Sequence, residues 1–342
     1  MHLVAFERRE PRHVSATARA ALHEASGGLE GLEEPPALGQ RIGAVASPDE
    51  VVDLNRALAL KFAVEDAGAP EAEADSLLPA DPVEFLRSFG EALDQARDAL
   101  AFLDGLRRRW DGPDLADLGV TESRGEVKVH APVPRPGKLI GVAGNHPSSG
   151  SGEAPPAQPL FFLKASSAVV GPEAEVVLPS CSRCVEPGGA LALVIGCEAR
   201  DVATAEALDC VAGYTAANDL VARDFPDAGG ASFMGRCFDT FAPLGPALVT
   251  RDEVGDPQAL AVRTRRNGEV VGDASTKEMV FPVAELVAFA SRIMTLEPGD
   301  VIFSPMSGSA DGGTPRWLQD GDVLEVQVER VGLLRSYVRR GS

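Results

Sequence analysis

The chain has 342 residues, of which 44% are hydrophobic and 24% charged, a composition typical of a folded protein with one large or two ordinary domains. Its net charge of −19 opposes phosphate backbones and anionic membrane surfaces, and no apolar run reaches about 18 residues, so neither nucleic acid nor membrane is expected as a partner. The first residues lack the basic start and long apolar stretch of a signal peptide, and five cysteines fit a reducing compartment, so a cytoplasmic location is expected.

Strand and helix patterns are mixed in the first part of the chain. Ser47 is followed by a proline and then by Glu50, a pattern typical of a capping box, so a helix is predicted to begin there. Asp81 before a proline predicts the start of a longer helix, in which apolar side chains recur about every 3.6 residues. The Gly- and Pro-rich sequence between the first two strands predicts a surface insertion. The predicted strands cover residues 1–8, 41–45 and 126–133, the insertion covers residues 9–40, and the helices cover residues 47–62 and 81–109.

Short β-rich runs separated by Gly and Pro turns dominate the second part. They read KLIGVAG, LFFLK, AEVVLP, ALALVIG, PALVT, ALAVRTRRNGEVV, DVIFS and DVLEVQVERVG. Asn267-Gly268 within the sixth run predicts a hairpin with a type I′ turn. Helices are expected only near 204–212 and 282–294. The strands lack a regular βαβ alternation, so the sequence predicts an α+β fold that is predominantly β, with domains 1–130 and 131–342.

The segment GYTAANDLVARD, Gly213–Asp224, resembles the signature of the fumarylacetoacetate hydrolase family. Further segments match the family in the same order: PVPRPGKLIGVAGN, LFFLKASSAVVGP, ALALVIGCEARDV, FDTFAPLGP, TLEPGDVIFS and LQDGDVLEVQVERVGLL. The resemblance implies a mixed β-roll catalytic domain with a smaller N-terminal α/β domain, and a homodimer. It also implies an enzyme that hydrolyses, decarboxylates, hydrates or isomerises 2-oxo acids or β-dicarbonyl compounds.

The same resemblance implies a Mg²⁺ or Mn²⁺ site in which Asp219 is one ligand. The family's other ligands are two glutamates spaced Glu-x-Glu, and Gly188 and Ala190 stand at those positions here. Glu186, two residues upstream, is either a relocated ligand or an exposed glutamate. Because hard cations need several oxygen donors, no metal is expected. If one binds, Glu186 and Asp219 are its expected ligands.

Substrate-binding residues are implied at three further matching positions. Arg223 stands where the family's arginine meets the substrate carboxylate, although an ion pair with Asp219 or Asp224 is the alternative. Arg236 replaces a lysine of the family, and a surface arginine is its alternative. Ser304 keeps a hydroxyl where the family has a Gly-Thr-Pro segment.

The loop NHPSSGSGE resembles the family's catalytic loop, in which a histidine held by a glutamate activates water. Asn145 matches, His146 takes a tyrosine position, Ser149 takes the histidine position, and Glu153 lies one residue beyond the expected glutamate. We expect Asn145 and Ser149 to bind substrate, and His146, Glu153 and Asp219 to transfer protons. The alternatives are a loop in which His146 is merely solvated and, for Asp219, an ordinary turn residue.

The leading hypothesis is an enzyme acting on an enolisable 2-oxo acid or β-dicarbonyl compound by metal-independent tautomerisation, cyclisation, dehydration or decarboxylation. A role in secondary metabolism would suit it. One alternative is a Mg²⁺-dependent C–C hydrolase or decarboxylase with ligands rebuilt from Glu186, Asp219 and Glu153. Another is a non-catalytic binding or scaffold paralogue. The pair Cys181 and Cys184 lacks the second close cysteine pair of a zinc ribbon, and its role stays open.

Overall fold

The structure is a computed structural model that describes residues 1–9, 32, 39–65, 68–109, 114–146, 156–225, 233–306 and 317–341. The chain divides into two compact units, Met1–His130 and Ala131–Ser342. The predicted class is confirmed, since strands outnumber helices in the described residues and both kinds of element are present. Within those residues, no helix has the length and apolar character needed to cross a membrane.

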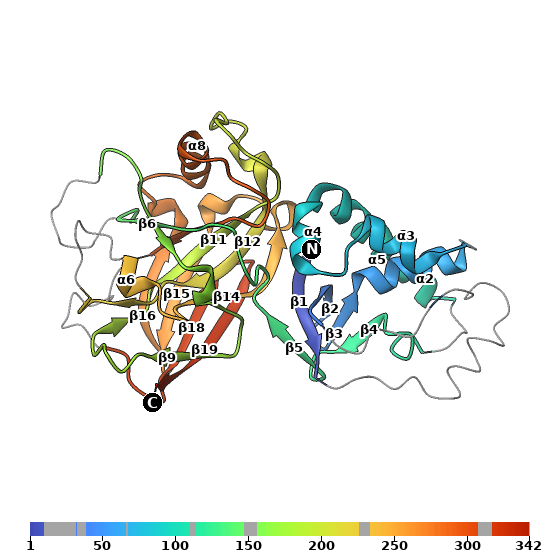
Figure 1. Ribbon diagram of the computed structural model, residues 1–342, viewed down its shortest axis with the longest axis horizontal. Helices are drawn as coiled ribbons and strands as arrows, with labels where there is room; N and C mark the ends of the chain where they lie inside the picture. The colour runs from blue at the N-terminus through green and yellow to red at the C-terminus, as the bar shows by residue number, and fades with distance from the viewer. Residues whose placement is uncertain are drawn as a thin grey trace. The chain divides into compact units, whose positions relative to one another are not determined.

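The first unit is an antiparallel sheet with helices gathered beside it (Figure 1). Strand β1 pairs with β2 and with β5, β2 pairs with β3, and β3 pairs with β4. The strands are β1 (His2–Arg8), β2 (Arg41–Ser47), β3 (Glu50–Asp53), β4 (Thr121–Ser123) and β5 (Val127–His130). The helices are α2 (Leu54–Val64), α3 (Pro70–Leu77), α4 (Pro82–Arg87) and α5 (Phe89–Arg107).

No helix begins at Ser47, so the predicted start of this helix is wrong. The hydroxyl of Ser47 accepts from the backbone N–H of Asp49 and forms a turn between β2 and β3. Residues 50–53 then continue as a strand, and Asp53 caps α2 by accepting from the N–H of Arg56. The helix start at Asp81 is confirmed, since its carboxylate accepts two backbone N–H bonds, but the chain breaks at Ser88 into α4 and α5.

The second unit is built on two sheets. In the larger one, the order within this unit is β14-β12-β11-β17-β6-β7, and the short β8 (Val169–Val170) pairs with β14. Its strands are β6 (Leu139–Ala143), β7 (Leu160–Lys164), β11 (Gly189–Ile195), β12 (Val211–Asn218), β14 (Ala242–Thr250) and β17 (Val301–Pro305). The strands expected from KLIGVAG, LFFLK, ALALVIG and DVIFS are therefore confirmed. The segment predicted as a helix near 204–212 is wrong, because only a 3-10 turn at Ala207–Cys210 precedes β12.

The second sheet has the order β16-β15-β18-β19-β9 (Figure 1). Its strands are β9 (Ala174–Leu178), β15 (Ala261–Arg266), β16 (Glu269–Ser275), β18 (Val323–Val328) and β19 (Gly332–Arg340). The predicted turn between β15 and β16 is confirmed, since Asn267 and Gly268 both have positive φ, 52° and 83°. A separate pair joins β10 (Val185–Glu186) to β13 (Val221–Ala222).

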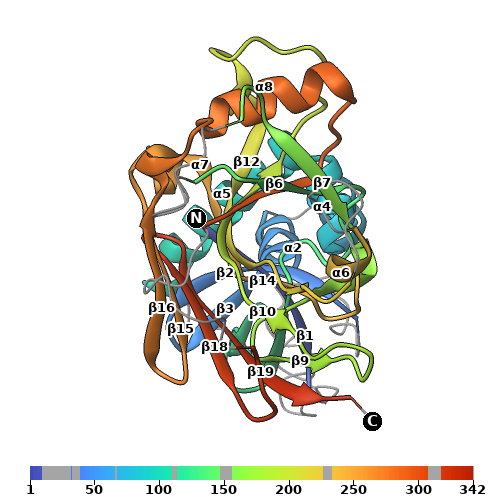
Figure 2. The same ribbon diagram turned by 90° about the vertical axis from the view of Figure 1, so that its left-hand side faces the viewer.

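The helices of the second unit are short, apart from α8 (Val283–Ile293), which confirms the prediction at 282–294. The other α-helices among the described residues of this unit are α6 (Phe233–Arg236) and α7 (Arg251–Val254). Buried side chains of α8, such as Leu286 and Val287, pack with Leu191 and Leu193 of β11 in one core cluster of the second unit, and Figure 2 shows α8 beside the strands. This core fills one face of the larger sheet.

The opposite face of the larger sheet carries different residues. Adjacent residues of a strand point to opposite faces. A Cβ placed on Gly189 would meet Thr264 of the second sheet, whereas one placed on Gly188 would lie 3.6 Å from the Cβ atoms of both Asp219 and Pro305. Asp219 therefore lies on the face that turns away from the second sheet.

Candidate functional site

Three charged side chains form a buried cluster around Asp219. Lys164, the last residue of β7, donates to Oδ1 of Asp219 at 2.7 Å. Arg236, the last residue of α6, donates through Nη1 to Oδ2. All three residues are less than 8% exposed. The structure thus brings together two predicted site residues, Asp219 and Arg236, and adds a third that was not predicted.

Lys164 is held by more than the carboxylate. Its Nζ also donates to the carbonyl of Leu220 at 3.0 Å and to that of Phe241 at 2.7 Å, so its three protons all have acceptors. Burial lowers the pKa of Lys164, and Asp219 opposes this effect. One signal in the sequence could have pointed to Lys164: it is a lone lysine at the end of the apolar run LFFLK, and a lysine that is buried with such a run needs a charged partner.

Arg236 lies over an aromatic face. The central carbon of its guanidinium is 4.0 Å from the centroid of the Phe162 ring, which favours a cation. Its Nε is buried and has no hydrogen-bond partner in the described part of the chain. Arg236 is 7% exposed, so the surface-arginine alternative is wrong.

The residues around Asp219 do not fit a divalent cation. Each carboxylate oxygen of Asp219 already accepts a hydrogen bond from a cationic side chain. Gly188, which adjoins Asp219, has no side-chain oxygen to bind a metal. Ala190 is fully buried and also has no side-chain oxygen that could bind a metal. Within the residues that the structure describes, no three His, Cys, Asp or Glu side chains gather as a metal site.

The predicted pairing of Glu186 with Asp219 as metal ligands is wrong. Glu186 belongs to β10 and not to β11, and its Oε1 accepts from Nε of Arg223 at 2.6 Å. The Arg223 side chain is 51% exposed. Arg223 is therefore ion-paired, with Glu186 rather than with Asp219 or Asp224, because β10 and β13 lie side by side. Asp224 accepts instead from Ser182 and from the N–H of Arg183.

Asn145 and Ser304 form a second buried cluster. The amide nitrogen of Asn145 donates to the Ser304 hydroxyl at 3.0 Å and to the carbonyl of Phe281 at 3.1 Å. Its amide oxygen accepts from the N–H of Phe281 at 2.8 Å, and its backbone carbonyl accepts from Val280. The side chain of Asn145 thus fastens the end of β6 to the segment before α8, which accounts for its burial.

His146 follows at once and is 6% exposed, so the alternative of a merely solvated side chain is wrong. Its Nε2 has no hydrogen-bond partner in the described residues. Burial lowers the pKa of His146, and the charge of Glu278 partly opposes this. Glu278 lies in the 3-10 turn Thr276–Glu278, just before the segment that Asn145 fastens. Ser149 and Glu153, and with Glu153 the predicted dyad, lie outside the described residues.

The two clusters face opposite sides of the larger sheet. The register pairs Ser304 with Leu191 and Pro305 with Ala190. Leu191 belongs to the core on the α8 face, whereas Pro305 lies on the Asp219 side. Within the described residues, no hydrogen bond joins Asn145, His146 or Ser304 to the cluster of Lys164 and Arg236. The predicted residues therefore form two separate groups.

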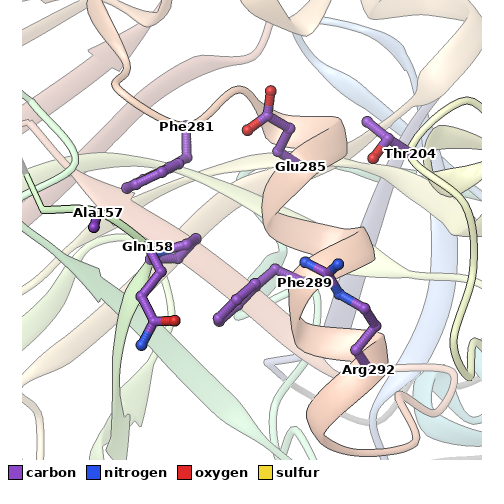
Figure 3. A pocket seen from close by; sticks show the side chains of 8 residues that line it. Ala157, Gln158, Thr204, Phe281, Glu285, Phe289 and Arg292 are labelled. Carbon is purple, nitrogen blue, oxygen red and sulfur yellow. The ribbon is translucent and has the colours of Figure 1, made fainter.

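A pocket of about 290 Å³ lies beside α8 (Figure 3). Glu285, Phe289 and Arg292 project into it from the helix, and Phe281 connects it to Asn145. The remaining lining residues are Ala157, Gln158, Pro159 and Thr204. Among the described residues, no predicted site residue lines this pocket, and the ionic groups that line it are one carboxylate and one guanidinium.

All five cysteines are described, and all carry free thiols. Cys181 is exposed and Cys184 is partly buried. The backbone carbonyl of Cys184 accepts from the N–H of Arg223, which ties this segment to β13. Neither cysteine joins a group of three candidate metal ligands among the described residues.

Comparison with known proteins gives consistent results over most of the chain. The family described as "Fumarylacetoacetate (FAA) hydrolase C-terminal" matches residues 140–339. The human mitochondrial oxaloacetate tautomerase is 38% identical over 266 residues, covering 76% of this chain and 80% of that protein.

Solved structures agree with these matches. The 2-hydroxyhepta-2,4-diene-1,7-dioate isomerase of Mycobacterium marinum superposes with a TM-score of 0.58 at 34% identity, covering 66% of this chain and 82% of its own. A maleylpyruvate hydrolase from Sphingobium in complex with manganese(II) and pyruvate gives 0.62 at 29% identity, covering 89% and 97%. The chain therefore belongs to the fumarylacetoacetate hydrolase family and is an enzyme of that type.

Proposed function

We propose that the protein is an isomerase that interconverts the keto and enol forms of a small 2-oxo acid, without a divalent cation. The observation that carries this proposal is the occupation of both Asp219 oxygens by Lys164 and Arg236. The names of the relatives support the reaction class, since they include an oxaloacetate tautomerase and a dienedioate isomerase. Keto–enol exchange moves only a proton, and so it demands less charge stabilisation than cleavage of a C–C bond.

Asp219 is the proposed proton carrier, because of the two predicted proton carriers that the structure describes, His146 and Asp219, it is the one that contacts the Arg236 guanidinium. Each of its oxygens accepts one bond from a cation, and a carboxylate has roughly four lone-pair sites, so it can still accept a substrate proton. The proton leaves the carbon beside the carbonyl, the C–H electron pair forms the C=C bond, and the carbonyl pair moves to oxygen. Return of the proton to that oxygen gives the enol, so atoms and electrons balance.

The test is the rate of oxaloacetate enol-to-keto conversion, followed by ultraviolet absorbance in buffer with excess EDTA. We expect turnover above the buffer-catalysed rate, and a loss of roughly a hundredfold or more in Asp219→Asn, the range of general acid–base catalysis. Turnover that survives this change unaltered would remove Asp219 from the mechanism. The absence of any tautomerase activity would refute the function itself.

A metal-dependent hydrolase is the competing function, and the maleylpyruvate hydrolase that contains manganese and pyruvate favours it. It predicts that EDTA abolishes activity and that Mn²⁺ or Mg²⁺ restores it. It also predicts formation of pyruvate from a substrate such as maleylpyruvate, which pyruvate-coupled absorbance detects. The tautomerase forms no pyruvate by cleavage.

A further inference from the structure

The guanidinium of Arg236 is the one group of the buried cluster with donor capacity left over. Lys164 uses all three of its protons on Asp219, Leu220 and Phe241. Arg236 spends Nη1 on Asp219, and its buried Nε has no partner in the described chain. An unsatisfied buried donor on a charged group is costly, so an acceptor is expected to arrive with a ligand.

The charge of the cluster points to the same kind of ligand. Two cations, Lys164 and Arg236, share one carboxylate, and no other described carboxylate forms an ion pair with either of them. The cluster therefore keeps a net positive charge in a site where its members are less than 8% exposed. An anionic oxygen would neutralise it, and a planar guanidinium suits a pair of neighbouring oxygens.

The position of Arg236 also explains how the site works without the missing carboxylates. Gly188 adjoins Asp219, so an acidic side chain there would have joined Asp219 around a cation. In this chain the guanidinium itself contacts Asp219 and rests on the Phe162 ring. A fixed cation next to Asp219 can stabilise a developing oxyanion as a metal ion would, and it needs no further ligands.

We infer that Arg236 binds the substrate's oxygens directly, in place of a divalent cation, and that the ligand is a planar anion with two adjacent oxygens, such as the enolate of a 2-oxo acid. This inference rests on the proposed function for the choice of ligand. Arg236 acts on the substrate, whereas Lys164 is a positioning residue that holds Asp219 and two backbone carbonyls in place.

The test is calorimetric binding of oxalate, a stable planar mimic of such an enolate, to the full chain in excess EDTA. We expect wild-type protein to bind oxalate under these conditions. Arg236→Met and Arg236→Lys are both expected to bind roughly ten to a hundred times more weakly, the range for a hydrogen bond to a charged group. Arg265→Met, at a partly buried position of β15 where the guanidinium bonds to Gln327 and not to the cluster, is the matched control and should bind as wild type does.

Folding of each variant is checked by circular dichroism, and the lysine variant keeps the charge where the methionine variant does not. Oxalate binding that appears only after Mg²⁺ or Mn²⁺ replaces EDTA would overturn the inference. Metal-free binding that both Arg236 variants retain would overturn it as well. If oxalate binds without metal and the binding depends on Arg236, but the protein has no tautomerase activity, the binding site stands and the proposed function is refuted.

Discussion

Replacing Lys164 by methionine tests whether the buried lysine holds this part of the second unit together. The change keeps an unbranched side chain of similar length but removes the ammonium. It leaves the carbonyl of Leu220 without its donor, and it leaves the carbonyl of Phe241 with only the N–H of Leu220. Asp219 keeps Arg236 alone. The Lys164 side chain is 0% exposed, so water cannot replace these bonds without a rearrangement of the site.

The expected cost follows from those three lost bonds. The buried carbonyl of Leu220, left unsatisfied, costs about 1–3 kcal/mol, whereas that of Phe241 keeps one donor. Removing one partner of a buried ion pair costs about 3–5 kcal/mol, and we take less than this because Asp219 keeps Arg236. Relief of the lysine's own desolvation offsets part of the sum, so we expect a net loss of about 2–4 kcal/mol. At about 2–4 °C per kcal/mol for a unit of this size, the melting temperature falls by roughly 4–16 °C.

The assay is thermal unfolding followed by circular dichroism, with Lys277→Met as the control. Lys277 is exposed; its backbone N–H donates to the hydroxyl of Ser275, and its ammonium forms no ion pair with any described residue. The control should melt within about 2 °C of wild type, since exposed substitutions usually change stability by under 0.5 kcal/mol. A fall of less than about 3 °C for Lys164→Met would mean that the lysine's bonds contribute little, and the reasoning about its role would be wrong.

Three further predictions concern the other predicted residues. Asn145→Ala should destabilise the second unit by about 2–4 kcal/mol in urea unfolding, because it leaves both backbone groups of Phe281 unbonded in partly buried surroundings; an unchanged midpoint would contradict this. Burial lowers the pKa of His146 below 6.5, so as the pH falls the imidazole is protonated in the unfolded chain before it is protonated in the folded one. Stability therefore falls as the pH drops below about 6.5. His146→Gln should flatten the pH dependence of the melting temperature in that range. Arg223→Ala should change stability by under about 1 kcal/mol, because its ion pair with Glu186 is exposed, and an oxaloacetate KM that also stays unchanged would exclude Arg223 from substrate binding.

The strand pattern of the second unit was readable from the sequence because it depends on local signals. Apolar runs such as LFFLK are bounded by turn residues, and they became β7 at Leu160–Lys164. The hairpin at Asn267 followed from the need for positive φ at two successive residues. The helix predicted at Ser47 failed because two β-branched valines after the turn pair with β2, and tertiary pairing outweighed the local capping pattern.

The site was only partly readable, because its contacts join residues far apart in the chain. Asp219 and Arg236 were found through the family motif, but the motif gave no information that one would bond to the other. Lys164 lies 55 residues before Asp219, and nothing local in the sequence announces that pair. Glu186 was misplaced because the spacing rule assumed one continuous strand, whereas the chain changes partner between β10 and β11.

The three bonds of Lys164 have a consequence for tracing this family's history. Two of these bonds are accepted by main-chain carbonyl oxygens. Selection for a stable fold therefore preserves this lysine even in a descendant that has lost catalytic activity. Its retention in a sequence therefore says little about turnover. The Nε of Arg236 has no hydrogen-bond partner in the described part of the chain and so adds no bond to the fold there. The identity of the residue at that position is therefore the better marker of a working enzyme.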